Sequence, residues 1–203
     1  RQPMEEGSIT VSRLNQTVVF PAKTMIAAAM NPCKCGFFPD LGKCRCTPTQ
    51  IRRYLNRVSG PFLDRIDIGV EVPRQDLGMM AAEKSIDEGS FPQTEQRNSS
   101  AVMRARVMEA RDRQEKRFAD ESISYNSQMT RRQIEEHCRL SGEDAVFLEK
   151  VERQQGISAR GHGKILKVAR TLADLDGQAE IGRTQLAEAI GFRSFEKKYW
   201  GSL

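Results

Sequence analysis

The sequence lacks the features that would place it in a membrane or on a secretory route. Its 203 residues include no apolar run near the roughly 20 residues that a membrane-spanning helix needs. The first residues, RQPMEEG, show no basic segment followed by an apolar one, so no signal peptide is expected. They also lack an initiator Met, which suggests a piece of a longer protein. We therefore expect a cytoplasmic chain with no membrane partner.

The two motifs with which many ATPases bind ATP are also missing. A phosphate-binding loop needs Gly, four residues, and then Gly-Lys-Ser/Thr. The stretch around Gly163 and Lys164 has Ser158 in place of the first Gly and Ile165 after the lysine. Residues 145–149, AVFLE, lack the aspartate of a Walker B strand and lie in a helical pattern. We expect that this chain alone does not hydrolyse ATP.

The composition is that of a soluble globular protein, with 38% apolar and 29% charged residues. The length suits one large domain or two small ones. Lys and Arg outnumber Asp and Glu by 32 to 27, a net charge of +5. This charge is compatible with binding to nucleic acid or nucleotide, and equally with a mildly basic surface that binds neither.

Four of the five cysteines form two close pairs, Cys33 with Cys35 and Cys44 with Cys46. Four thiolates so spaced can surround one zinc ion at about 2.3 Å, and four protein ligands leave no open position, so the role would be structural. The alternatives are reduced cysteines without metal, or two disulfides. A chain without an export signal favours metal over disulfides. Cys138 stands alone in a helical pattern and is expected to be an ordinary, partly buried thiol.

The first 75 residues predict a mixed α/β segment. Residues 9–20 have a hairpin pattern, with alternating apolar residues on both sides of a polar pair. Residues 25–30 form a short apolar run typical of a buried parallel strand, although a buried helix has the same pattern. After the loop at 33–46, a helix is predicted from Thr47 to about Arg57. Residues 66–72 alternate like a further strand. These strands are too few for a core, so we expect the sheet to be incomplete.

The remainder predicts a polar linker and then helices only. Residues 74–98 are rich in Gly, Ser and Gln, which is typical of a linker or a mobile loop. The apolar spacing and capping residues after it predict five helices. The first contains Met103, Val107 and Ala110, the second is capped by Thr130 with Gln133, and the third is capped by Ser141 and has Ala145, Leu148 and Val151 on one face. The fourth runs from Ser158 to Leu175 with Ile165, Ala169 and Leu172 on one face, and the fifth covers 183–189.

Three polar residues stand where they could meet a phosphate. Asn31 ends the predicted strand at 25–30, and ligands bind beyond the carboxyl ends of such strands. Arg65 lies just before a predicted strand, and a guanidinium suits a transferring phosphoryl group. Arg160 lies at the start of the strongest helix, and helix N-termini attract anions. Each has a plain structural alternative: a turn-forming Asn before Pro, a salt bridge of Arg65 with Asp64 or Asp67, and a solvated basic first turn.

Taken in order, three stretches resemble the magnesium-chelatase-like AAA+ ATPase family of the ComM/YifB type. They are TVSRLNQTVVFPAKTMIAAAMNPCKCG, RYLNRVSGPFLDRIDIGVEV and GISARGHGKILKVARTLADLDG. The resemblance covers nearly the whole chain and is thinnest over residues 74–98. It implies the C-terminal part of an AAA+ P-loop NTPase core, with an incomplete parallel sheet, a hairpin and a zinc loop, over residues 1–75. A linker over 76–96 and a helical lid domain over 97–203 would follow.

The resemblance also implies roles for single residues. Asn31 falls on the sensor 1 position, Arg65 on the trans-acting arginine finger, and Arg160 on sensor 2. The longer protein would use ATP and Mg²⁺, form a ring with copies of itself, expected to be a hexamer, and act on DNA in branch migration. The alternative classes are a zinc-stabilised protein-interaction module and a chelatase-type ATPase with no DNA role.

Overall fold

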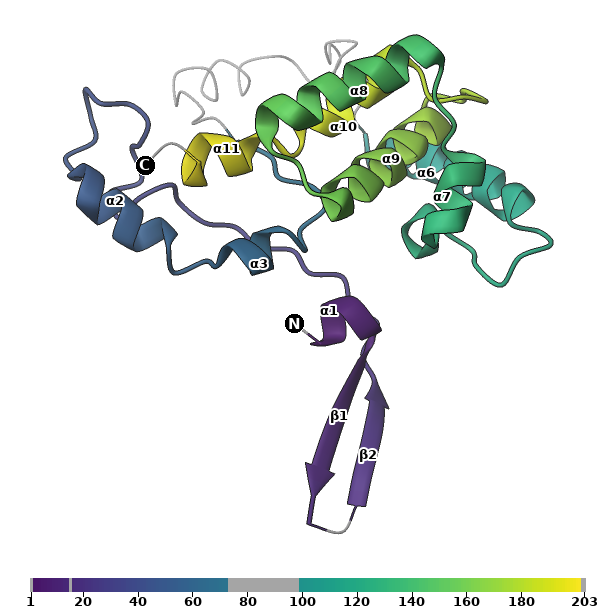
Figure 1. Cartoon of the computed structure of the whole chain (residues 1–203), viewed down its shortest axis with the longest axis horizontal. Helices are drawn as coiled ribbons and strands as arrows, with labels where there is room; N and C mark the ends of the chain where they lie inside the picture. The colour runs from purple at the N-terminus through teal and green to yellow at the C-terminus, as the bar shows by residue number, and fades with distance from the viewer. Residues whose placement is uncertain (1, 15, 73–98, 202–203) are drawn as a thin grey trace, which may run out of the picture. The chain divides into compact units, whose positions relative to one another are not determined.

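The protein is a mixed α/β chain, mostly helical, with a small two-stranded sheet in the part that the structure describes (Figure 1). The computed structural model describes residues 2–14, 16–72 and 99–201. The chain divides into two compact units. We call Arg1–Ile66 with Glu196–Leu203 the cysteine-loop unit, and Asp67–Phe195 the helical unit.

The cysteine-loop unit begins with a short helix and a hairpin. Helix α1 (Gln2–Glu6) leads into β1 (Ser8–Arg13), which pairs antiparallel with β2 (Gln16–Pro21) (Figure 1). Val11 lies opposite Val18, so apolar side chains from both strands share one face, and both are exposed. The hairpin predicted over residues 9–20 is confirmed.

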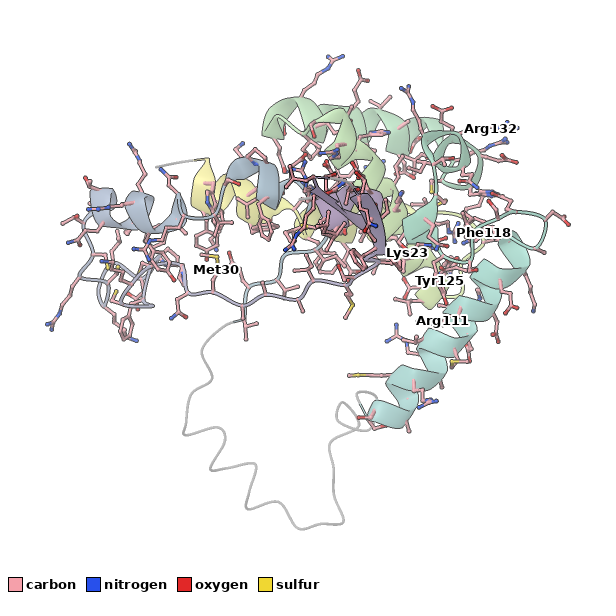
Figure 2. The ribbon with its side chains drawn as sticks, turned by 90° about the horizontal axis from the view of Figure 1, so that it is seen from below. Lys23, Met30, Arg111, Phe118, Tyr125 and Arg132 are labelled. Carbon is pink, nitrogen blue, oxygen red and sulfur yellow. The ribbon has the colours of Figure 1, made fainter. Side chains whose placement is uncertain are left out.

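The two further strands predicted in this part are wrong. Residues 25–30 and 66–72 form neither helix nor strand. Their apolar side chains are exposed: Met30 is 48% and Val70 is 67% accessible, and Figure 2 shows the Met30 side chain. A strand exists only by hydrogen bonding to a neighbouring strand, and among the described residues the paired strands are β1 and β2. An apolar run reveals a preference for burial but not the partner that would satisfy it.

The helix after the cysteine loop is confirmed. Helix α2 (Pro48–Leu55) begins at a capping box, in which the Thr47 side chain accepts from the Gln50 backbone N–H and the Gln50 side chain accepts from the Thr47 N–H. It ends two residues before the predicted Arg57. A short helix that the sequence patterns did not indicate, α3 (Gly60–Leu63), follows.

The helical unit is built around α9. Its elements are α6 (Ser100–Arg117), the 3₁₀ turn η1 (Asn126–Gln128), α7 (Arg131–His137), α8 (Gly142–Gln155), α9 (Ala159–Leu175) and α10 (Arg183–Gly191). Helix α9 packs against α6, α7, η1 and α10 (Figure 1). Its predicted apolar face is confirmed, since Ile165 and Ala169 are fully buried and Leu172 packs against the same core.

The predicted helix starts are confirmed by their caps. Thr130 accepts from the N–H of Gln133, and Ser141 and Ser158 each accept from a backbone N–H of their own first turn. One predicted face is wrong in part, because Ala145 is exposed while Leu148 is buried. Asp144 takes the place of Ala145 on the buried side of α8, whereas Leu148 and Val151 lie on it as predicted.

Helix α6 is confirmed, but much of its predicted apolar face is not buried. Met103 and Val107 are 50% and 44% exposed, and Ala110 is buried. The second half of the helix meets the segment before η1, where the Arg111 guanidinium lies 5.1 Å from the centre of the Tyr125 ring (Figure 2). Packing of α6 is therefore concentrated in its C-terminal half.

A buried polar network joins α6, η1 and α9. Asp174 is fully buried and pairs with Arg117 and, at 3.2 Å, with Arg170. It also accepts from the amide of Asn126 at 2.8 Å, and the Asn126 backbone N–H donates to Gln114 at 3.0 Å. Buried charges are tolerated when they are paired and hydrogen-bonded, so this network fixes the register of three elements.

The last helix, α11 (Ser194–Trp200), was not predicted. Its residues from Glu196 onward belong to the cysteine-loop unit. The predicted linker at 74–98 lies outside the described residues. Within residues 2–14, 16–72 and 99–201, no helix is long and apolar enough to cross a membrane.

Candidate metal centre and arginine sites

The four paired cysteines lie together. The Sγ atoms of Cys33, Cys35, Cys44 and Cys46 are all within 4.8 Å of one another. Cys33 is 3.3 Å from Cys35 and 3.8 Å from Cys44, and Cys35 is 3.6 Å from Cys44. Four sulfurs bound tetrahedrally to zinc at 2.3 Å would be about 3.8 Å apart. The donor set and its geometry therefore fit one structural zinc ion.

Two backbone turns bring the pairs together. The Gly36 N–H donates to the Cys33 carbonyl at 3.1 Å, and Gly36 has a φ of 77°, which favours glycine. At the other side of the loop the Cys44 N–H donates to the Asp40 carbonyl at 2.8 Å. The loop thus folds back on itself.

The loop makes two thiols of the cluster more acidic than the others. The backbone N–H of Phe37 lowers the pKa of Cys35 to about 6. For Cys44 the N–H of Cys46 acts in the same direction, but burial and the neighbouring sulfurs together raise its pKa to about 12. A cluster without metal therefore resists full ionisation because further thiolates would repel the first ones. A bound dication removes this barrier and displaces the protons.

The cluster is supported by the helix that follows it. Cys33 is fully buried, and Ile51 and Leu55, one turn apart on α2, are 3% and 1% exposed and pack with it. Since Thr47 caps α2 directly after Cys46, the loop and the helix form one packed element.

Cys138 lies elsewhere, at the end of α7. It is buried rather than partly buried, and burial raises its pKa to about 11.

Asn31 and Arg65 both belong to the cysteine-loop unit. Asn31 is exposed two residues before Cys33, and does not end a strand, because that segment is irregular. Arg65 is 14% exposed, donates to the carbonyl of Pro61, and pairs with Glu5 of α1 at 2.6 Å. Glu5 had no signal in the sequence, because the two residues are 60 positions apart.

Arg160 lies in the first turn of α9 and is exposed. Around it, His162 contacts Glu152 at 2.6 Å, and Lys164 pairs with Asp67 at 2.9 Å. Asp67 is thus a partner of the α9 segment. Gly161 is buried, and a Cβ there would lie only 2.7 Å from the Ile157 side chain. The glycine therefore permits the close approach of the capping segment to the helix.

Two family models match the chain. The model of the magnesium chelatase subunit ChlI matches residues 1–80, and that of the ChlI C-terminal part matches residues 97–193.

Among curated proteins, the chain is 41% identical over 195 residues to the competence protein ComM of Haemophilus influenzae. It is 39% identical over 197 residues to the uncharacterized protein YifB of Escherichia coli, and 37% identical over 197 residues to YifB of Salmonella typhimurium. These alignments cover 96–97% of this chain and 35–36% of each relative, so the chain spans about a third of their length. We conclude that the chain belongs to the magnesium-chelatase-like family that includes ComM and YifB.

Proposed function

We propose that this chain supplies nucleotide-sensing residues to a ring-forming AAA+ ATPase, with Asn31 as sensor 1, Arg65 as arginine finger and Arg160 as sensor 2. The observation that carries the proposal is the match to the ChlI models over residues 1–80 and 97–193, which contain all three. ATP and Mg²⁺ would bind to the longer protein, whose rings we expect to be hexamers. Residues 1–75 would be the end of its ATPase core and 97–203 its lid, joined by 76–96.

The chemistry of Arg65 supports its proposed role. Its guanidinium already holds an anion, the Glu5 carboxylate, at 2.6 Å. A guanidinium that binds a planar carboxylate presents the same donors to phosphate oxygens. In an assembled ring a γ-phosphate of the neighbouring subunit would compete with Glu5 for those donors, and the gain would be largest in the transition state.

Arg160 is supported by its place on α9. The first turn of a long helix has backbone N–H groups and a positive dipole end directed toward an anion. Arg160 adds a charged side chain that is exposed at that end. A lid that contacts a phosphate through Arg160 would report the nucleotide state to the α9 core.

Zinc at Cys33, Cys35, Cys44 and Cys46 would be structural in this scheme, because the four thiolates fill a tetrahedral shell. Metal analysis of the purified chain should give about one equivalent of zinc. A Cys33→Ser, Cys35→Ser double variant should lose it, and Cys138→Ser should keep it. A reduced preparation without metal and with free thiols at all four of these positions would contradict the site.

The decisive test of the arginine finger uses mixed rings of the longer protein. Arg65→Ala should lower ATP turnover on the order of a thousandfold while changing ATP affinity little. A variant without the Walker A lysine should be inactive as well. Mixing the two should restore part of the activity, because an intact ATP site then faces an intact finger. Mixed rings that form and stay inactive would rule out a trans role. This 203-residue chain alone should not turn over ATP.

We further propose that the longer protein moves DNA branches by ATP hydrolysis. The net charge of +5 and the 41% identity to the competence protein ComM support this proposal. Branched DNA should stimulate ATP turnover, and ATP should drive strand exchange in a branch-migration assay. Turnover that is indifferent to DNA would favour a chelatase-type ATPase without a DNA role.

A further inference from the structure

The cysteine-loop unit is completed by the far end of the chain. It consists of residues up to Ile66 together with those from Glu196 onward, so the helical unit is inserted between its two parts. The returning residues form most of α11. The contacts that hold these residues in the cysteine-loop unit therefore anchor the chain at both ends of the inserted segment.

The contacts that hold α11 are made with the cysteine loop and with the end of α2. The Tyr199 ring meets the Phe38 ring edge-on, with centres 6.1 Å apart. The Trp200 indole N–H donates to the Leu55 carbonyl at 3.1 Å. Both aromatic residues pack against the cluster formed by the buried Cys33, Ile51 and Leu55.

Phe38 owes its position to the cysteines. It lies between Cys35 and Cys44, in a loop for which the structure shows turns and bends but neither helix nor strand. A loop this short buries little apolar surface of its own. Its fold therefore depends on bringing the thiolates of both pairs together, which requires a cation to offset their repulsion.

We propose that the four-cysteine site is a metal-dependent clasp for the C-terminal helix of this chain. Metal binding folds the loop, the folded loop places Phe38 beside Leu55, and Tyr199 and Trp200 dock on the surface so formed. The proposal rests on the zinc site proposed above and adds its purpose, which is to hold together the two chain segments that make up the cysteine-loop unit.

Thermodynamic linkage predicts that docking of α11 also changes the affinity of the chain for zinc. If zinc favours docking of α11, docking must favour zinc by the same factor. A Tyr199→Ala, Trp200→Ala double variant keeps all four thiols but removes the docked aromatic groups. Its dissociation constant for zinc should be higher by at least about fivefold, the lower end of typical coupling between sites. Lys197→Ala, an exposed position on the same helix, is the matched control and should leave the constant unchanged.

Trp200 is the chain's single tryptophan, so its fluorescence reports docking directly. The 203-residue chain is stripped of metal with a chelator under reducing conditions and titrated with Zn²⁺. Stripping should move the emission to longer wavelength and increase quenching by acrylamide. One equivalent of Zn²⁺ should reverse both changes. The Cys33→Ser, Cys35→Ser variant should show the exposed emission with or without Zn²⁺.

The outcomes separate the clasp from the metal site. One equivalent of bound zinc with no change in Trp200 emission or quenching, and an unchanged zinc affinity in the Tyr199→Ala, Trp200→Ala variant, would overturn the clasp and leave the site standing. A chain that binds no zinc would overturn both. Far-UV circular dichroism of the stripped chain checks that the helical unit stays folded, so that a change at Trp200 is read as undocking.

Discussion

Replacing Asp174 by Ala should destabilise the helical unit more than any surface change. The carboxylate is fully buried and pairs with Arg117 and Arg170, which are 16% and 3% exposed. Its removal leaves two cations close together with no counter-charge, and it takes an acceptor from Asn126. Breaking a buried ion pair from one side costs about 3–5 kcal/mol. Since domains are stable by about 5–15 kcal/mol, this loss is a large part of the total.

The matched control is Asp176→Ala, two residues further along. Asp176 is 41% exposed, its ion pair with Arg106 is 3.8 Å long, and it accepts a hydrogen bond from the Gln185 side chain at 2.8 Å. An exposed pair of this kind contributes about 0–1 kcal/mol. Urea unfolding followed by far-UV circular dichroism measures both variants, because most of the described helix lies in the helical unit. Trp200 fluorescence would report the other unit. Equal losses of unfolding free energy in the two variants would refute the network as a stabilising element.

Three further predictions concern ionisation and the finger. The side chains of Gln133 and His137 lower the pKa of Glu121, and the Arg183 guanidinium lowers that of Asp144. Both carboxylates therefore contribute stability that is present above about pH 4 and is lost as the pH falls through their lowered pKa values. The urea concentration at the unfolding midpoint should decrease as the pH is lowered toward about 3, and less steeply in Asp144→Asn. In the metal-stripped chain, iodoacetamide should modify Cys35 well before Cys138, as mass spectrometry will show, because burial shields Cys138 and raises its pKa; equal rates would contradict its burial. In the longer protein, Glu5→Gln should raise ATP turnover by up to about fivefold, since it weakens an ion pair of roughly 1 kcal/mol that competes for Arg65; a loss of turnover would instead make Glu5 a positioning residue.

Local signals predicted the local structures well. Thr47, Thr130 and Ser141 were each predicted as helix caps, and Ser158 was predicted as a helix start; each of the four accepts a backbone N–H. Capping depends on residues within one turn of each other, so the sequence contains all the information that it needs. The same holds for the hairpin, whose strands are adjacent in the chain.

Non-local structure was predicted poorly. The apolar run at 25–30 has the composition of a buried strand but lies exposed, because a parallel strand depends on distant partners. Helix α11 and its docking against Phe38 had no signal, since the contact joins residues more than 160 positions apart. Glu5 was missed as the partner of Arg65 for the same reason.

The sequence by itself determined the spacing of four cysteines in two close pairs, the helix caps and the stretches that carry the family resemblance. Each of these is a pattern over a short stretch of the chain. Only the tertiary structure decided that the four sulfurs lie within 4.8 Å, that Asp174 is buried between two arginines, and that residues 196–201 return to the cysteine-loop unit. These features depend on which distant surfaces exclude water from one another. Periodicity along the chain indicates that a face will be buried but cannot name the surface that covers it.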